Sequence, residues 1–134
     1  MKKGFTCSCF DLMHPGHMKR LQDARDQCDY LIVGLQTDPT IDRPNTKNKP
    51  IQTLEERQIM LSAVRFIDEI MIYDTEDNLY KYLKKNKPDI RILGSDYKGK
   101  YFTGIDIHNV DIYFHERDHN YSSTNLRKKL LENK

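Results

Sequence analysis

Two histidines three residues apart, His14 and His17, are the strongest candidates for chemistry in this sequence. They enclose Pro15 and Gly16, and they stand between a small, β-branched and apolar stretch and a pattern of helical spacing. A helix that starts near His14 places the proline in its first turn, where the missing N–H costs nothing. Gly16 lets a bulky anion approach the backbone, and both imidazoles project from one helix face. This pattern predicts a phosphate site at a helix N-terminus.

Strand-length apolar runs and patterns of helical spacing alternate along the chain, and these elements must position the histidines. The expected strands cover residues 4–10, 30–35, 67–72, 89–93 and 110–114, and the expected helices cover residues 18–28, 53–64, 75–87 and a segment after residue 124. The run 30–35 is apolar throughout, as in a parallel strand covered on both faces. We therefore predict an α/β fold, a Rossmann-like, doubly wound parallel sheet of about five strands with helices on both faces. A ligand is then expected outside the carboxyl ends of the strands.

Length and charge narrow the class of protein. The 134 residues favour a single domain, residues 1–134, with a core that needs no disulfides. A net charge of +2 is too small for a typical polyanion-binding surface, so we expect no nucleic acid partner. The apolar runs are too short to cross a membrane, and no signal peptide is visible. We expect a cytoplasmic protein without a membrane partner.

The three cysteines do not suggest a metal site. Cys7 and Cys9 fall on one face of the expected first strand, and Cys28 closes the first helix. A disulfide between neighbours is not expected in the cytosol, and C-x-C without further ligands at suitable spacing is a poor zinc site. We expect packing residues and no protein-held metal.

Further candidates lie between the second and third strands. The loop over residues 40–50 is rich in proline and basic residues, among them Lys49, and is long enough to be functional. Thr53 and Glu56 form a capping box for the next helix. Arg57 lies in the first turn of that helix, where a cation opposes the helix dipole, and Arg65 follows at its end. The unfavourable placement of Arg57 suggests a functional reason.

The stretch from Cys9 to His17 resembles the G-T-F-D-x-x-H-x-G-H signature of a nucleotidyltransferase superfamily. That superfamily includes cytidylyltransferases for glycerol 3-phosphate and choline phosphate and adenylyltransferases for heptose phosphate and pantetheine phosphate. Ser8 and Cys9 stand where the signature has glycine and threonine. The resemblance implies that Ser8, Cys9, Phe10, Asp11 and Gly16 contribute to nucleotide binding.

The same resemblance extends over nearly the whole chain. Gly94, Asp96 and Tyr97 match a G-x-D-W/Y segment that helps to hold the nucleoside, and Arg57 and Arg65 match two arginines for the phosphates. The last motif, R-T-x-G-x-S-T-T, is matched by Arg117, Ser122, Ser123 and Thr124, whereas Asp118 and Asn120 replace its usual threonine and glycine. His115 and His119 match no motif and remain unassigned.

The implied reaction is attack by a substrate phosphate on the α-phosphorus of a nucleoside triphosphate. His14, His17, Arg117 and Lys49 would stabilise the charge that develops, and Mg²⁺ would arrive bound to the nucleotide. Asp11 would orient neighbouring basic side chains or a metal-bound water. The resemblance also implies a homodimer.

Substrate identity stays open at this point. Chain length and motifs most resemble a CTP:glycerol-3-phosphate cytidylyltransferase, so we expect CTP and a small phosphorylated acceptor as partners. An adenylyltransferase for a sugar phosphate such as heptose 1-phosphate is the alternative, and flavin-nucleotide synthesis is a third possibility. A non-catalytic nucleotide sensor and a response-regulator-like receiver belong to other classes. A receiver needs clustered acidic residues at its strand ends, whereas here the strand ends carry histidine, glycine and hydroxyl residues.

Overall fold

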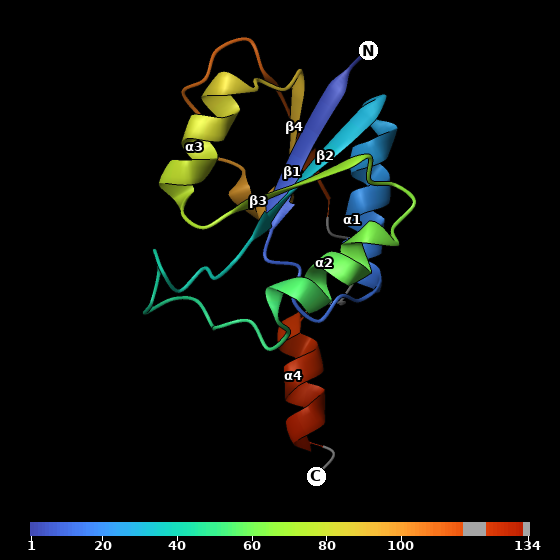
Figure 1. Ribbon diagram of the computed structural model, residues 1–134, viewed down its shortest axis with the longest axis vertical. Coiled ribbons are helices and arrows are strands. Elements are labelled where there is room, and N and C mark those ends of the chain that lie inside the picture. The colour runs from blue at the N-terminus through green and yellow to red at the C-terminus, as the bar shows by residue number, and fades with distance from the viewer. Residues whose placement is uncertain (117–122, 133–134) are drawn as a thin grey trace.

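A computed structural model describes residues 1–116 and 123–132 of the chain, as a parallel sheet flanked by helices (Figure 1). The strands are β1 (Lys3–Ser8), β2 (Tyr30–Gln36), β3 (Glu69–Tyr73), β4 (Ile90–Gly94) and β5 (Asp111–His115). The helices are α1 (Pro15–Asp26), α2 (Leu54–Ser62), α3 (Glu76–Lys85), the single 3₁₀ turn η1 (Ser95–Tyr97) and α4 (Ser123–Glu132).

The five strands form one sheet in the order β3-β2-β1-β4-β5, and every neighbouring pair is parallel. The chain moves outward from β1 to β3, then crosses back to β4 on the other side of β1. The strand order therefore reverses between β1 and β4, which is the switch point where such sheets bind ligands. The predicted doubly wound α/β fold is confirmed.

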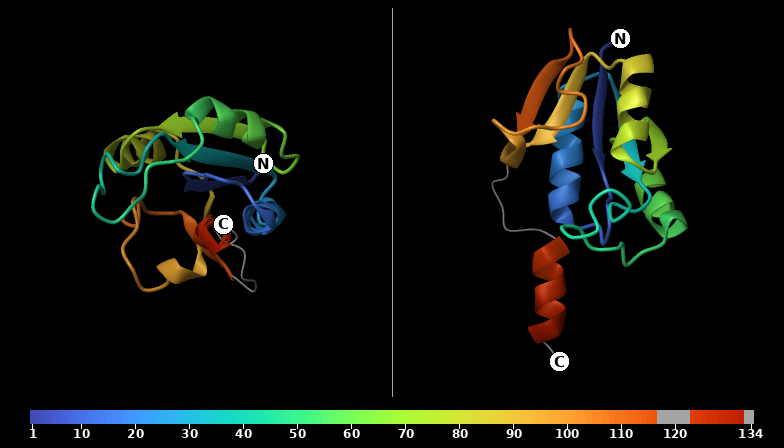
Figure 2. Two further views of the ribbon diagram at one scale, coloured as in Figure 1. Left: turned by 90° about the horizontal axis from the view of Figure 1, so that it is seen from below. Right: turned by 90° about the vertical axis from the view of Figure 1, so that its left-hand side faces the viewer.

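Two hydrophobic layers cover the sheet, one on each face. Leu21 and Ala24 of α1 and Leu61 of α2 pack on one face. Leu79 and Leu83 of α3 pack on the other face. Figure 2 shows α1 and α3 on opposite sides of the sheet. Because both layers are buried, the strand ends and their connecting loops are the parts of the sheet left for a ligand.

Of the two element boundaries near the histidines, the end of the first strand differs from the expected one. The strand β1 ends at Ser8, so Cys9 and Phe10 belong to the following loop. The helix α1 begins at Pro15 with His14 as its N-cap residue, as the sequence predicted, so both histidines stand at its N-terminus.

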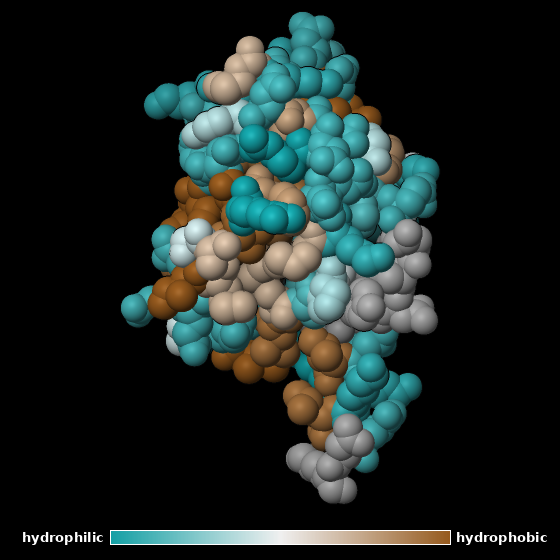
Figure 3. All heavy atoms as spheres, turned by 90° about the vertical axis from the view of Figure 1, so that its right-hand side faces the viewer, coloured by the Kyte–Doolittle hydropathy of each residue, from teal (hydrophilic) through white to brown (hydrophobic). Residues whose placement is uncertain are grey.

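The last helix, α4, stands beyond the carboxyl edge of the sheet and points away from the body (Figures 1 and 2). Its side chains Leu126, Leu130 and Leu131 are exposed. Figure 3 shows this helix with hydrophobic side chains beside a hydrophobic area of the body. No helix in the described ranges is long and apolar enough to span a bilayer.

Candidate active site

His14 and His17 form a reciprocal cap at the N-terminus of α1. His14 is the N-cap residue, and its Nδ1 accepts a hydrogen bond of 3.1 Å from the backbone N–H of Gly16. His17 Nδ1 accepts one of 3.2 Å from the backbone N–H of His14. The two ring centroids lie 4.1 Å apart. The spacing of the two histidines predicted that their rings share a face, and the structure places the rings in contact.

These two hydrogen bonds decide which ring nitrogen carries the proton. An Nδ1 atom that accepts a hydrogen bond is unprotonated, so in the neutral ring Nε2 holds the hydrogen. Both imidazoles are therefore arranged as Nε2–H donors at a helix N-terminus. Donors at the positive end of a helix dipole suit a phosphate oxygen.

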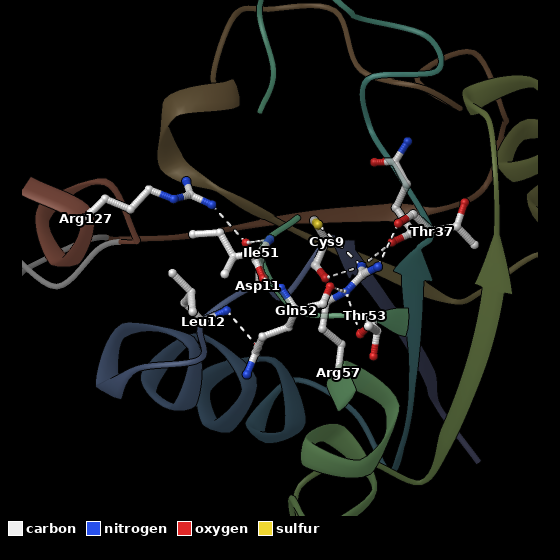
Figure 4. Close-up of polar contacts among 10 residues, drawn as sticks. Cys9, Asp11, Leu12, Thr37, Ile51, Gln52, Thr53, Arg57 and Arg127 are labelled. Atoms are coloured by element: carbon white, nitrogen blue, oxygen red, sulfur yellow. Dashed lines mark hydrogen bonds and ion pairs between the residues drawn. The ribbon is translucent and has the colours of Figure 1, made fainter. Parts of the chain in front are cut away.

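The loop that enters α1 is strained on either side of Asp11. Phe10 has φ of 52° and Leu12 has φ of 50°, in the left-handed region that residues with side chains seldom adopt. The Asp11 carboxylate accepts hydrogen bonds of 2.8 and 2.9 Å from the backbone N–H groups of Ile51 and Gln52 (Figure 4). The carboxylate thereby fixes the loop against the residues that precede α2.

Arg127 is a partner of Asp11 that sequence analysis missed. Its guanidinium donates to the Asp11 carboxylate at 2.8 Å, from α4 across the front of the site. Figure 4 shows this contact joining segments that are far apart in the sequence. Asp11 was expected to orient a basic side chain, but no local pattern identifies Arg127 as its partner. Only the docking of α4 does so.

The structure places Arg57 differently from the expectation that it contacts the nucleotide phosphates. Only 2% of Arg57 is exposed, and its guanidinium donates to backbone carbonyl oxygens, with the shortest two hydrogen bonds at 2.6 and 2.7 Å. The accepting carbonyls belong to Cys9, Gln36, Thr37, Gln52 and Thr53. Arg57 therefore joins the ends of β1 and β2 to the start of α2 (Figure 4). Its geometry supports a structural role.

Two other predicted phosphate ligands lie apart from the histidines. Arg65 follows the far end of α2, where its guanidinium lies over the Phe66 ring at 5.2 Å. Because α2 runs back along the sheet, that end lies away from the carboxyl edge, and the structure does not bring Arg65 to the site. Lys49 is exposed on the loop after β2, with its ammonium 3.9 Å from the Asp38 carboxylate. Its contact with a phosphate stays a prediction.

The segment after β4 lies at the carboxyl edge, as expected. Gly94 ends the strand, and η1 contains Asp96, which is exposed, and Tyr97, which is half-buried. A Cβ atom on Gly94 would lie 2.6 Å from the Asp96 carboxylate, so a larger residue here would displace that exposed side chain. Contact of this segment with a nucleoside stays a prediction.

The last predicted motif is only partly described. Arg117 and Ser122 lie outside the described residues, as do Asp118 and His119. Ser123 is the first residue of α4, and Thr124 is exposed in its first turn. His115, which matched no motif, ends β5, and its Nδ1 lies 2.7 Å from the Asp23 carboxylate of α1.

The cysteines do not gather with other metal-ligating side chains in the described residues. All three are free and half-buried. Burial raises the pKa of the Cys9 thiol against the opposing effect of Arg57, so the thiol stays protonated at neutral pH. In the described ranges, no group of three or more His, Cys, Asp or Glu side chains could hold a metal ion. The expectation that Mg²⁺ arrives on the nucleotide stays a prediction.

A cavity of about 330 Å³ opens beside the histidine loop. Ser8 and Cys9, at the end of β1, form part of its wall, and Tyr97 of η1 forms another part. Its volume is at the lower end of the range for small-molecule sites. The site thus has a helix N-terminus with two imidazoles and an adjoining pocket at one edge of the sheet.

Comparisons with known proteins agree with this geometry. A family model described as cytidylyltransferase-like matches residues 5–129. The "Bifunctional protein HldE" of Campylobacter concisus is 42% identical over 103 residues, which is 77% of this chain and 22% of that protein. The protein of the same name from Caulobacter vibrioides is 34% identical over 129 residues, which is 94% of this chain and 26% of that protein. The chain therefore spans about a quarter of the length of these relatives.

Solved structures share the fold at lower identity. A lipopolysaccharide core biosynthesis protein from Thermoplasma volcanium aligns with a TM-score of 0.61 and 22% identity, over 98% of this chain and 88% of that one. A bifunctional NMN adenylyltransferase/ADP ribose pyrophosphatase from Francisella tularensis aligns with a TM-score of 0.63 and 19% identity, over 98% of this chain and 42% of that one. The family match covers nearly all of the sequence and includes the histidine loop. The chain therefore belongs to the cytidylyltransferase-like family of nucleotidyltransferases.

Proposed function

We propose that this chain transfers an adenylyl group from ATP to the phosphate of a sugar phosphate such as heptose 1-phosphate. The observation that carries the transferase part of the proposal is the pair of imidazoles that cap the start of α1. Both Nδ1 atoms accept backbone N–H groups, so both Nε2–H groups serve as phosphate donors. The capping hydrogen bonds hold both rings in a fixed orientation at the positive end of the helix dipole.

The choice of acceptor differs from the leading expectation of the sequence analysis. Motifs and length favoured CTP and glycerol 3-phosphate, with the heptose phosphate adenylyltransferases as the alternative. The relatives named HldE, at 34–43% identity, favour that alternative. The matched part of each relative is one segment of a longer protein, so the activity of this chain is inferred from its own site together with that similarity.

The reaction is an in-line displacement at the α-phosphorus. An oxygen of the acceptor phosphate forms the new P–O bond, and the bond to the bridging oxygen of the β-phosphate breaks. Pyrophosphate leaves with that electron pair, so the protein supplies no nucleophile. His14 and His17 donate hydrogen bonds to non-bridging oxygens whose charge grows in the transition state. One such donor contributes a factor of about 10²–10³ in turnover.

The other residues of the site position these donors. Asp11 holds the loop before α1 against the residues before α2, and Arg127 neutralises its buried carboxylate. The nucleotide substrate is MgATP, in which Mg²⁺ offsets phosphate charge and keeps most of its waters. Lys49, on the exposed loop after β2, and Arg117 are the proposed cationic contacts for the leaving pyrophosphate.

The experiment that tests this function is pyrophosphate release with purified protein and Mg²⁺. ATP and CTP are each paired with heptose 1-phosphate, mannose 1-phosphate and glycerol 3-phosphate, and products are identified by ³¹P NMR. Release with ATP and heptose 1-phosphate supports the proposal. Release only with CTP and glycerol 3-phosphate would restore the cytidylyltransferase assignment. Nucleotide binding without release from any pair would instead favour a sensor.

A further inference from the structure

The cavity beside the histidine loop lies in a fork between β1 and β4. The strand β1 pairs with β2 at six positions, but with β4 only at Gly4 and Phe5. Beyond Phe5 the two strands separate toward their carboxyl ends. Cys7 on β1 and Leu93 on β4 line opposite walls of the space that opens. The fork is thus a recess built at the switch point of the sheet.

Two arginines enter this fork from opposite faces of the sheet. Arg20 comes from α1, and its guanidinium donates to the Thr6 hydroxyl at 2.6 Å and to the Cys7 carbonyl at 2.9 Å. Arg91 comes from β4 on the α3 face, where it lies 5.1 Å from the centroid of the Phe102 ring. Only 4% of Arg91 is exposed, and both side chains line the cavity.

A third arginine closes the cavity from the loop after β2. Arg43 pairs with Glu76 at 3.3 Å, and the Asp42 carboxylate accepts from the backbone N–H of Glu76 at 2.6 Å. Thr103 donates to the same Glu76 carboxylate at 2.9 Å. These contacts fix the loop to the start of α3, and Arg43 thereby forms part of the cavity wall.

The positive charge inside this cavity is not balanced by the protein around it. Among the described residues, the buried Nε atoms of Arg20, Arg43 and Arg91 all lack a hydrogen-bond partner. Glu76 is the sole carboxylate in the described lining, and Arg43 and Thr103 already engage it. Burial lowers the pKa of Arg20, yet an arginine stays protonated in proteins. Buried cations without a counterion are costly, which points to an anion that arrives from outside.

We infer that this cavity is the acceptor site, where Arg20 and Arg91 bind the phosphate of a phosphorylated sugar and Arg43 covers it. The inference rests on the proposed transferase function. The cavity begins at Ser8 and Cys9, the residues that lead into the histidine loop, so a phosphate in the fork adjoins the place where the nucleotide phosphates are expected.

The remaining lining fits the hydroxyl groups of a sugar. The amide Nε2 of Gln36 is buried, lines the cavity and has no partner within the described ranges. Burial strongly raises the pKa of Tyr73, so its hydroxyl remains a neutral donor at physiological pH. Thr103 adds a further hydroxyl on the outer wall. Several neutral polar groups around a cationic end match a polyhydroxylated phosphate monoester.

The kinetic test compares Arg20→Gln and Arg91→Gln with Arg25→Gln. Arg25 lies on the same helix as Arg20 but pairs with Asp68 outside the cavity. We expect each cavity variant to raise the KM for heptose 1-phosphate about tenfold or more, because a charge-assisted hydrogen bond is lost. The KM for ATP should change by less than about twofold, and Arg25→Gln should change neither. A raised KM for ATP with an unchanged KM for the sugar phosphate would overturn the assignment.

A binding test separates this inference from the proposed activity. The side-chain Nε–H signals of Arg20, Arg43 and Arg91 can be followed by ¹⁵N NMR while heptose 1-phosphate or mannose 1-phosphate is added without nucleotide. We expect these signals to shift with sugar phosphate and to stay unshifted with ATP alone. Shifts without any catalysed transfer would retain the acceptor site and reject the transferase. Transfer without such shifts would retain the transferase and reject the acceptor site.

The NMR titration uses the unmodified chain, so its result does not depend on whether the variants fold. Thermal unfolding of Arg20→Gln and Arg91→Gln, compared with Arg25→Gln, shows whether a changed KM comes from a damaged fold. If both cavity variants unfold at room temperature, the NMR result alone decides the assignment.

Discussion

Arg57 is a cation whose role depends on what surrounds it. A cation in the first turn of a helix opposes the dipole, and this unfavourable placement suggested a phosphate ligand. In the structure, the side chain leaves its own helix and reaches the carbonyl oxygens at the ends of β1 and β2. Carbonyl groups at strand ends lack ladder partners, so a buried guanidinium with five N–H donors satisfies several of them at once.

We expect Arg57→Met to lower the free energy of unfolding by about 3 kcal/mol or more, because buried carbonyl oxygens lose their donor. Urea denaturation measures this change. Arg65→Met is the matched control, an exposed arginine beyond the same helix, and should cost about 0.5 kcal/mol or less. If Arg57→Met proved as stable as the unmodified protein and raised the KM for ATP, the phosphate role would be supported and the structural role rejected.

His17 combines a structural and a chemical role, and a single substitution can separate them. Its Nδ1 completes the capping box of α1, a part that glutamine also plays at this helix position. We expect His17→Gln to keep the fold and to lower turnover about a hundredfold or more, because the Nε2–H donor is lost. Steady-state kinetics and thermal unfolding test both expectations.

The matched control for this substitution is His108→Gln, at an exposed histidine of the loop before β5. It should leave turnover unchanged. Turnover close to that of the unmodified protein in a folded His17→Gln variant would contradict the assigned role of His17.

At the scale of elements, the N-termini of α1 and α2 meet through one carboxylate. Asp11 precedes α1 and accepts the backbone N–H groups of Ile51 and Gln52, just before α2. The first turn of α2 is also capped by Thr53, whose hydroxyl accepts from Glu56 at 3.1 Å, as the sequence predicted. Side chains of the protein cap both helices, and only the cap of α1 is built from imidazoles, which carry a second ring nitrogen as a donor.

The left-handed residues Phe10 and Leu12 belong to this same connection. Each non-glycine residue with positive φ costs on the order of 1 kcal/mol, and such strain tends to occur at functional loops. The buried Phe10 ring and the Asp11 carboxylate hold the loop in this conformation. The strain places Asp11 and the histidines on one edge of the sheet with few connecting residues.

At the scale of the molecule, the helices α2 and α4 each expose several of the large hydrophobic side chains found on the surface. Ile59 and Met60 are exposed on α2, and Leu126, Leu130 and Leu131 are exposed on α4. The homodimer implied by the family resemblance would cover residues of this kind, and burying apolar surface is worth about 25 cal/mol per Å². Figure 3 shows the hydrophobic side chains of α4 close to a hydrophobic area on the body.

We therefore expect sedimentation equilibrium to give twice the mass of the chain, and Leu130→Lys to shift the protein toward the monomer. The control is Lys128→Gln on the same helix, which removes an exposed charge and should leave the mass unchanged. A monomeric mass for the unmodified protein at all concentrations would contradict the homodimer.

The order of the elements could be predicted from the sequence because its signals are local. Apolar periodicity, the Thr53–Glu56 capping box and the Pro15–Gly16 helix start depend only on neighbouring residues. The strands and helices occur in the predicted order along the described chain. The prediction of a phosphate site at the start of α1 rests on the same local rules. Its residues are contiguous, so their mutual geometry depends on a single helix terminus.

The partners of the charged side chains were decided only by the tertiary structure. Arg57 binds carbonyls that lie more than twenty residues before it in the chain, and Arg127 reaches Asp11 across nearly the whole sequence. Arg20 and Arg91 line the same cavity because the sheet reverses its strand order between β1 and β4. Sequence spacing determines which residues share a helix face, whereas long side chains find their partners only after the sheet order has brought distant segments together.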